Sequence, residues 1–126
     1  MFLRSIASAA GTLALAGALV AVVQAPASAA GCTGTHLDNW SIRGGYIAVY
    51  YNSSTGRNCA MTYTNTPGKK QYISVTISTS GDSDHDSGSF TTYAGPVSVY
   101  AKGKCISFQG RVQNYPTEGV VDVYCG

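Results

Sequence analysis

YISVTIS, residues 72–78, carries the clearest structural signal in this sequence. Three aliphatic residues at positions 73, 75 and 77 alternate with three hydroxyl residues at positions 74, 76 and 78. Successive side chains of a β-strand point to opposite faces of a sheet, so this alternation predicts a strand with one face in a core and the other towards water. We expect Ile73, Val75 and Ile77 to point inwards.

Comparable β-rich segments lie on both sides of this strand, separated by short runs of turn-forming residues. The residues from Gly31 to Gly45 are predicted to be an irregular lead-in, and Ser80–Gly88 a polar loop. About seven strands, near ten residues apart, predict an all-β fold, a small antiparallel sandwich or barrel. The further strands are expected at Tyr46–Tyr51, Cys59–Thr64, Ser89–Tyr93, Val97–Ala101, Cys105–Val112 and Val121–Cys125.

The composition after residue 30 favours strands over helices. Leu37 and Glu118 are the only Leu and Glu in that part of the chain, which holds all nine Tyr of the sequence. The formal net charge of the whole sequence is +2, and its Lys and Arg residues form no strong cluster. We expect no nucleic-acid partner, because gripping phosphates requires concentrated positive charge.

Residues 1–30 have the pattern of a secretory signal peptide. Arg4 precedes an apolar run from Ala9 to Val23, and Ala27-Ser28-Ala29 gives the A-x-A pattern of a cleavage site. Cleavage after residue 29 or 30 would leave Gly31–Gly126 as a single exported β domain with no transmembrane segment.

Two alternatives for this leader stay open. The first is a retained membrane anchor, although the apolar run is shorter than the roughly 20 residues that span a bilayer. The second is a lipobox at Ala29-Ala30-Gly31-Cys32, in which Cys32 would become an acylated N-terminus.

Four cysteines lie in the expected exported part, and an even number in a short secreted chain is typical of disulfide bonds. Three pairings are possible, and we predict Cys32 with Cys59 and Cys105 with Cys125. A metal site is not expected, because the cysteines form no C-x-x-C unit and have no nearby His pair. We expect no cofactor.

Asp82-x-Asp84-x-Asp86 resembles the start of a calcium loop, because hard cations bind several carboxylates of one short segment. The match fails at Ser87 and Tyr93, where such loops have Gly and a bidentate Glu. We expect a solvated acidic loop.

Gly81-Asp82-Ser83 and Asp86-Ser87-Gly88, beside His85, resemble serine-hydrolase signatures. A nucleophilic Ser needs a positioned base, an orienting acid and an oxyanion hole, and His36 and His85 are the only candidate bases. The chain has no G-x-S-x-G motif, and a single Glu gives little support to a glycosidase pair. We expect no catalytic residues and no enzymatic activity.

Trp40 and the tyrosines admit two interpretations, a flat platform for sugar rings or a partner protein, or completion of the core and cross-strand pairing. By strand parity, Tyr50, Tyr63, Tyr72 and Tyr100 lie opposite the inward aliphatic residues or close to that face. We expect these four to be the more exposed ones.

Three segments, with the closing Cys125-Gly126, carry a family resemblance. They are YNSSTGRNC (51–59), DSGSFTTYAGPV (86–97) and AKGKCI (101–106), about a third of residues 31–126. In their order and their position around three of the four cysteines they resemble the spore-associated protein A family of sporulating actinomycetes. The resemblance implies a small exported protein found with spores or aerial hyphae, with no established catalytic residues.

The favoured function is that of a non-enzymatic, disulfide-stabilised β protein exported to the medium or the spore surface. One alternative is an inhibitor of secreted hydrolases that presents Asn52–Asn58 or Ser80–Gly88 as a rigid loop, which lowers the entropy lost on binding. Another is a carbohydrate- or wall-binding module that uses the tyrosines. The expected partner is therefore cell wall, a glycan or a secreted hydrolase.

Overall fold

The structure is a computed structural model that describes residues 31–126, and these form eight antiparallel strands. Residues 31–126 contain no helix, and therefore none with the length and hydrophobicity needed to cross a bilayer. The predicted signal peptide, residues 1–30, lies outside the described residues. The strands are β2 (Thr35–Ile42), β3 (Gly45–Asn52), β4 (Arg57–Thr64), β5 (Gln71–Thr79), β6 (Asp82–Phe90), β7 (Tyr93–Tyr100), β8 (Ile106–Val112) and β9 (Glu118–Val123).

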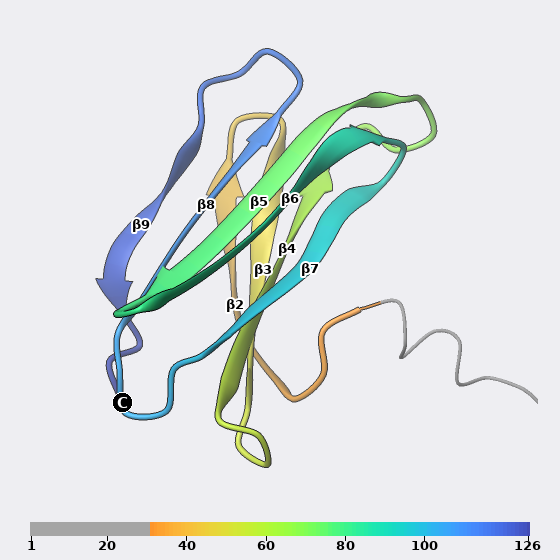
Figure 1. Cartoon of the computed structure of the whole chain (residues 1–126). Coiled ribbons are helices and arrows are strands. Elements are labelled where there is room, and N and C mark those ends of the chain that lie inside the picture. The colour runs from red at the N-terminus through yellow and green to blue at the C-terminus, as the bar shows by residue number, and fades with distance from the viewer. Residues whose placement is uncertain (1–30) are drawn as a thin grey trace, which may run out of the picture. The chain divides into compact units, whose positions relative to one another are not determined.

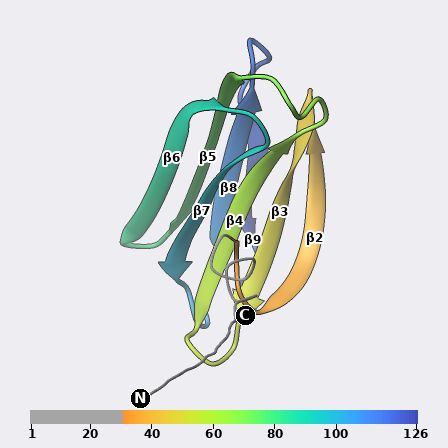
Figure 2. The ribbon, with the colours of Figure 1, turned by 90° about the vertical axis from the view of Figure 1, so that its right-hand side faces the viewer.

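The eight strands form two four-stranded sheets, with the order β2-β3-β4-β7 in the first and β6-β5-β8-β9 in the second. Figure 1 shows β5 and β6 lying across the layer that contains β2, β3 and β4. Figure 2 shows the same two layers from the side. The predicted sandwich is confirmed, with eight strands in place of about seven.

The core lies between the two sheets and consists mainly of β-branched residues, whose stiff side chains suit a pleated surface. The YISVTIS segment is part of β5, a central strand between β6 and β8, and Ile73, Val75 and Ile77 are fully buried as predicted. The other core residues include Ile47, Val49, Ala60, Val97, Val99, Ile106, Phe108 and Val112.

The predicted lead-in is wrong, because residues 35–42 form strand β2. This edge strand pairs with β3 and has a register shift between His36 and Asp38, which interrupts the two-residue period. Leu37 and Trp40 pack against the core, and the Trp40 ring contacts Phe108 edge-on with 5.7 Å between ring centroids. Residues 35–42 have few apolar side chains and no regular two-residue alternation, so the sequence did not predict this strand.

The two disulfides join the predicted partners. Cys32–Cys59 ties the segment before β2 to β4, and Cys105–Cys125 ties the segment before β8 to the segment after β9. Because the Cys32 sulfur is bonded to Cys59, it is not free for the lipid thioether of the lipobox alternative.

Candidate functional site

The predicted acidic loop is in fact β6, an edge strand of the second sheet. It pairs along its whole length with β5, from Thr79 opposite Asp82 to Gln71 opposite Phe90. Since residues directly opposite each other share a face, Asp84 and Asp86 lie on the same side as the buried Ile77 and Val75.

These two carboxylates accept hydrogen bonds from the backbone of β7, the edge strand of the first sheet. Gly95 N donates to Asp86 Oδ2 at 2.7 Å, and Ser98 N donates to Asp84 Oδ2 at 3.0 Å. A free sheet edge exposes unpaired N–H groups, and inward-pointing charges are one way in which proteins protect such edges. The carboxylates therefore connect the two sheets along one side of the sandwich. Residues 31–126 hold no group of three His, Cys, Asp or Glu side chains placed to bind a metal.

The opposite face of β6 carries Ser83, His85, Ser87 and Ser89, all exposed. In the two segments that resemble hydrolase signatures, the serines therefore point to one face of the sheet and the aspartates to the other. His85 Nδ1 is 2.8 Å from the Thr76 Oγ1 atom on β5, a pairing of opposed residues. The two strings do not assemble a nucleophile, base and acid.

Serine and threonine hydroxyls cover the outer surface of the second sheet across three neighbouring strands. Ser78 lies opposite both Ser83 and Ser107, and Ser74 lies opposite Ser87. Neighbouring strands lie about 4.8 Å apart, so these hydroxyls form a regular array. We call this surface the hydroxyl face; its members are Thr76, Ser78, Ser83, Ser87, Ser89 and Ser107. Ser74 was predicted to face water but is only 7% exposed, so it is not counted with them.

The hydroxyl face has few charges and is bordered by an aromatic residue. Arg111 lies at one end, opposite Ser74, with its guanidinium carbon 5.1 Å from the centre of the Tyr72 ring. At the other side a groove of about 280 Å³ runs beside β9 and is lined by hydroxyl-face residues, Gln109 and Val121. The surface offers many neutral donors and acceptors.

A row of tyrosines crosses the outer surface of the first sheet. Tyr46 on β3 stacks on Tyr63 on β4 with 5.2 Å between centroids and 15° between planes, and Tyr93 on β7 lies 5.5 Å from Tyr63. Burial, followed by the neighbouring Tyr50, Tyr46 and Tyr93, raises the pKa of Tyr63 above its ordinary value. Tyr46 and Tyr63 cover one another's ring faces and Tyr93 is tilted by 53° to Tyr63, so the three rings do not lie in one plane as a flat sugar platform would require.

The four tyrosines predicted to be exposed do not share one surface. Tyr72 and Tyr100 are 41% and 48% exposed, whereas Tyr50 and Tyr63 are half-buried. Tyr72 belongs to the second sheet and the others to the first. Two further exposed tyrosines, Tyr115 and Tyr124, follow strands and gave no parity signal.

The chain is similar to one curated protein whose name describes where it is found. It is 34% identical to spore-associated protein A of Streptomyces coelicolor over 114 residues, which cover 79% of this chain and 73% of that protein. The chain belongs to the spore-associated protein A family. No protein-family model matches the chain. No solved structure matches it either.

In this member of the spore-associated protein A family, the segments that carried the resemblance hold the fold together. Segment 51–59 forms the turn of the β3–β4 hairpin with the adjoining strand ends and contains Cys59, and segment 101–106 contains Cys105. Segment 86–97 contains both Asp86 and its donor Gly95. These segments therefore include two of the four disulfide cysteines and one contact between the sheets, while most of the hydroxyl face lies outside them.

Proposed function

We propose that this chain is an exported, non-enzymatic protein of the spore or cell surface, and that its hydroxyl face binds neutral glycan in the wall. The observation that carries the proposal is the array of Ser and Thr hydroxyls over β6, β5 and β8. Each hydroxyl both donates and accepts hydrogen bonds, as sugar hydroxyls do. The exposed ring of Tyr72 at the border adds an apolar surface for sugar C–H groups.

The arrangement of titratable groups supports a non-enzymatic role. The serines of β6 and the aspartates of β6 lie on opposite faces, and Asp84 and Asp86 accept backbone N–H groups. His85 bonds to Thr76 on an open sheet face and has no orienting carboxylate among the described side chains. A serine hydrolase would need a nucleophile, a base and an orienting acid in contact, and the Ser, His and Asp side chains of β6 do not have that arrangement.

Two facts support a location outside the cell. The S. coelicolor relative is named for its association with spores, and all four cysteines of this chain are paired in disulfides, as suits an oxidising compartment. The inhibitor alternative is weakened, because Ser80–Gly88 is largely strand β6, which leaves the Asn52–Asn58 hairpin as its only presented loop.

Location is tested by immunodetection of the protein on washed spores, in culture fluid and in the cytosol of the producing organism. We expect it on spores or hyphal surfaces and in the fluid. Detection in the cytosol alone would end the proposal.

Glycan binding is tested by sedimentation of the purified protein with isolated cell walls. Because the hydroxyl face has few charges, we expect retention to persist in 1 M NaCl, where the screening length is about 3 Å. The variant S83A/S87A/S89A removes three exposed hydroxyls and is expected to lower retention several-fold. The matched control S41A/S53A/S54A removes three hydroxyls elsewhere and should retain binding. Equal retention of both variants, or release by salt, would contradict the proposal.

A further inference from the structure

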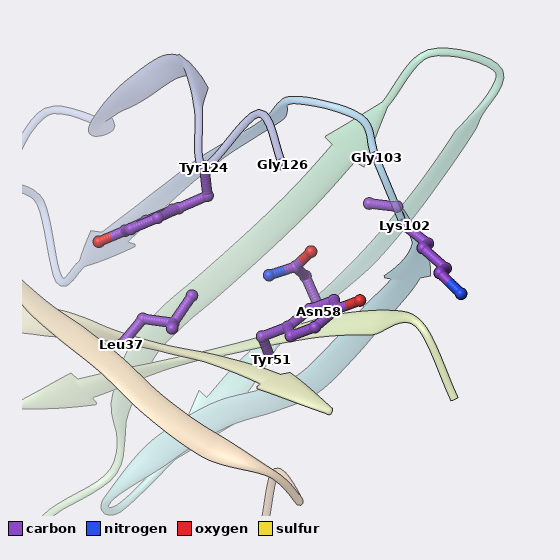
Figure 3. Close-up of a pocket in the computed structure, with 8 residues that line it drawn as sticks. Leu37, Tyr51, Asn58, Lys102, Gly103, Tyr124 and Gly126 are labelled. Atoms are coloured by element: carbon purple, nitrogen blue, oxygen red, sulfur yellow. The ribbon is translucent and has the colours of Figure 1, made fainter. Parts of the chain in front are cut away.

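A pocket opens at one end of the sandwich, between the two sheets and away from the hydroxyl face. Its volume is about 510 Å³, and its walls include Leu37 from β2, Tyr51 from β3, Ala101 after β7 and Tyr124 after β9. In Figure 3, Tyr124 lies across the opening from Leu37, and Asn58 lies to their right with Tyr51, the residue opposite it on β3. The size lies within the range typical of small-molecule sites, roughly 300–1,000 Å³.

We propose that this pocket binds a small, uncharged, mainly apolar molecule that donates one hydrogen bond to the side-chain oxygen of Asn58. The inference goes beyond the proposed wall binding and does not depend on it, because the pocket and the hydroxyl face share no residue.

Asn58 is the polar group that points to a ligand. It is only 2% exposed, and it lies on the inner side of β4, opposite Tyr51 on β3 and Val99 on β7. Its Nδ2 donates to the Tyr50 carbonyl oxygen at 3.2 Å. A carbonyl oxygen can only accept a hydrogen bond, so the NH₂ group of Asn58 must face Tyr50, and this fixes the orientation of the amide.

The Oδ1 atom of Asn58 therefore faces away from Tyr50, and within residues 31–126 it accepts no hydrogen bond. Within residues 31–126, the side-chain polar atoms that are both fully enclosed and without a hydrogen-bond partner are Trp40 Nε1 and Thr62 Oγ1. The Asn58 Oδ1 atom has no partner but is not among them, so it is not fully enclosed. Buried polar atoms normally have a hydrogen-bond partner, and Asn58 lines the pocket. We therefore infer that its unpartnered oxygen faces the pocket. The pocket thus offers a single fixed acceptor.

The chemical class of the ligand follows from the walls. Two tyrosine rings and aliphatic side chains favour an apolar, preferably aromatic, body. The Asn58 oxygen accepts a hydrogen bond and so selects an O–H or N–H donor. Lys102 is the only charged side chain in the lining, and Figure 3 shows its ammonium pointing away from Asn58. The other side chains that line the pocket are uncharged, so the side chains beside Asn58 favour an uncharged ligand.

The Cys105–Cys125 disulfide frames the pocket. It joins the segment that follows Gly103 to the residue that follows Tyr124, and both Gly103 and Tyr124 line the opening. This bond holds the two wall segments together, so the pocket is formed before a ligand arrives, which lowers the ordering cost of binding.

The test uses N-phenyl-1-naphthylamine, a neutral fluorescent probe with an aromatic body and one N–H donor. We expect saturable binding of one probe per chain, with increased and blue-shifted emission. The N-methylated probe lacks the donor and is expected to bind about 2- to 10-fold more weakly, the range that one neutral hydrogen bond spans. In a ¹H–¹⁵N spectrum of the wild-type protein, the side-chain NH₂ signal of Asn58 should shift on titration.

Two tyrosine variants of similar exposure provide the matched comparison. Tyr124→Ala removes a wall of the pocket, whereas Tyr72→Ala removes a ring from the outer surface of the second sheet; the two rings are 37% and 41% exposed. We expect Y124A to weaken probe binding at least fivefold and Y72A to leave it unchanged.

Asn58→Leu keeps the side-chain size and should abolish the preference for the N–H probe. If N58L does not fold, the role of the Asn58 oxygen is tested on the wild-type protein by the affinities of the two probes and by the NMR shift. The proposal is overturned by absence of saturable binding, by equal affinity of the two probes, or by equal losses in Y124A and Y72A.

Discussion

Asp86→Ala tests whether the carboxylates of β6 fasten the two sheets together along β7. Removing this side chain leaves the Gly95 N–H without the acceptor that now lies 2.7 Å away. Hydrogen bonds to charged groups contribute roughly 1.5–3 kcal/mol to stability. Asp86 is half-buried, so we expect the free energy of unfolding to fall by about 1.5–2 kcal/mol. Asp84 is exposed and its bond to Ser98 N is longer, so D84A should cost less.

Asp82→Ala is the matched control. Asp82 lies on the same side of β6, opposite Thr79, but its side chain makes no hydrogen bond within residues 31–126. Surface substitutions of this kind change stability by less than about 0.5 kcal/mol. Asp86→Asn keeps an oxygen acceptor without the charge, so its free energy of unfolding should lie between those of D86A and the wild type.

The assay is equilibrium unfolding in guanidinium chloride under non-reducing conditions, followed by the fluorescence of Trp40, which packs against the core. In a thermal experiment, 1 kcal/mol corresponds to about 4–8 °C in a domain of this size, so D86A should lower Tm by about 6–16 °C. Equal effects of D82A and D86A would refute the role of the Asp86 carboxylate, because the two variants remove the same charge from the same strand.

Three further predictions concern the core, the disulfides and the tyrosine row. Ile77→Ala should reduce the free energy of unfolding by about 2–5 kcal/mol, measured in the same denaturant assay, because Ile77 is fully buried in a central strand. Replacing both cysteines of either disulfide by Ser should cost about 3–4 kcal/mol, since the bonds close loops with separations of 27 and 20 residues; an unchanged denaturation midpoint would contradict this. The raised pKa of Tyr63 means that the unfolded chain loses this proton first, near pH 10, so stability should fall as pH rises above about 10. Tyr63→Phe should flatten that part of the stability profile, measured as denaturation midpoints from pH 8 to 11.

The strands with alternating aliphatic residues could be predicted from the sequence. Ile73, Val75 and Ile77 in β5, and Ile106, Phe108 and Val112 in β8, lie on the core side as their parity predicts. A strand whose inner face is apolar carries its own signal, because burial of that face drives its formation. The disulfide pairing was predictable because it joins cysteines that are neighbours along the sequence.

Strand β6 could not be predicted in the same way, because nothing on its inner face from Asp82 to Asp86 is apolar. Its composition of Asp, Ser and Gly is typical of loops, and only pairing with β5 makes it a strand. The hydroxyl face was missed for this reason. The hydroxyls on β5 could be predicted from the alternation in YISVTIS. Those on β6 could not, because they join the same face only through the pairing of β6 with β5. The role of the Asn58 oxygen could not be predicted, since Asn residues are common beside hairpin turns.

The register between β5 and β6 links the structural and the proposed binding roles of β6. A slip of one residue would turn every side chain to the opposite face. The aspartates would then enter the hydroxyl face, and the serines would meet the edge of β7, where they could not supply the charged acceptors for Gly95 and Ser98. The short turn between Thr79 and Asp82 sets the register, and in it Gly81 has φ of 87°, a conformation that L side chains rarely adopt. A Cβ at Gly81 would meet no atom within 4 Å, so the backbone conformation alone explains the glycine. Substituting it by a β-branched residue would therefore strain the turn that places serines outwards and carboxylates towards β7.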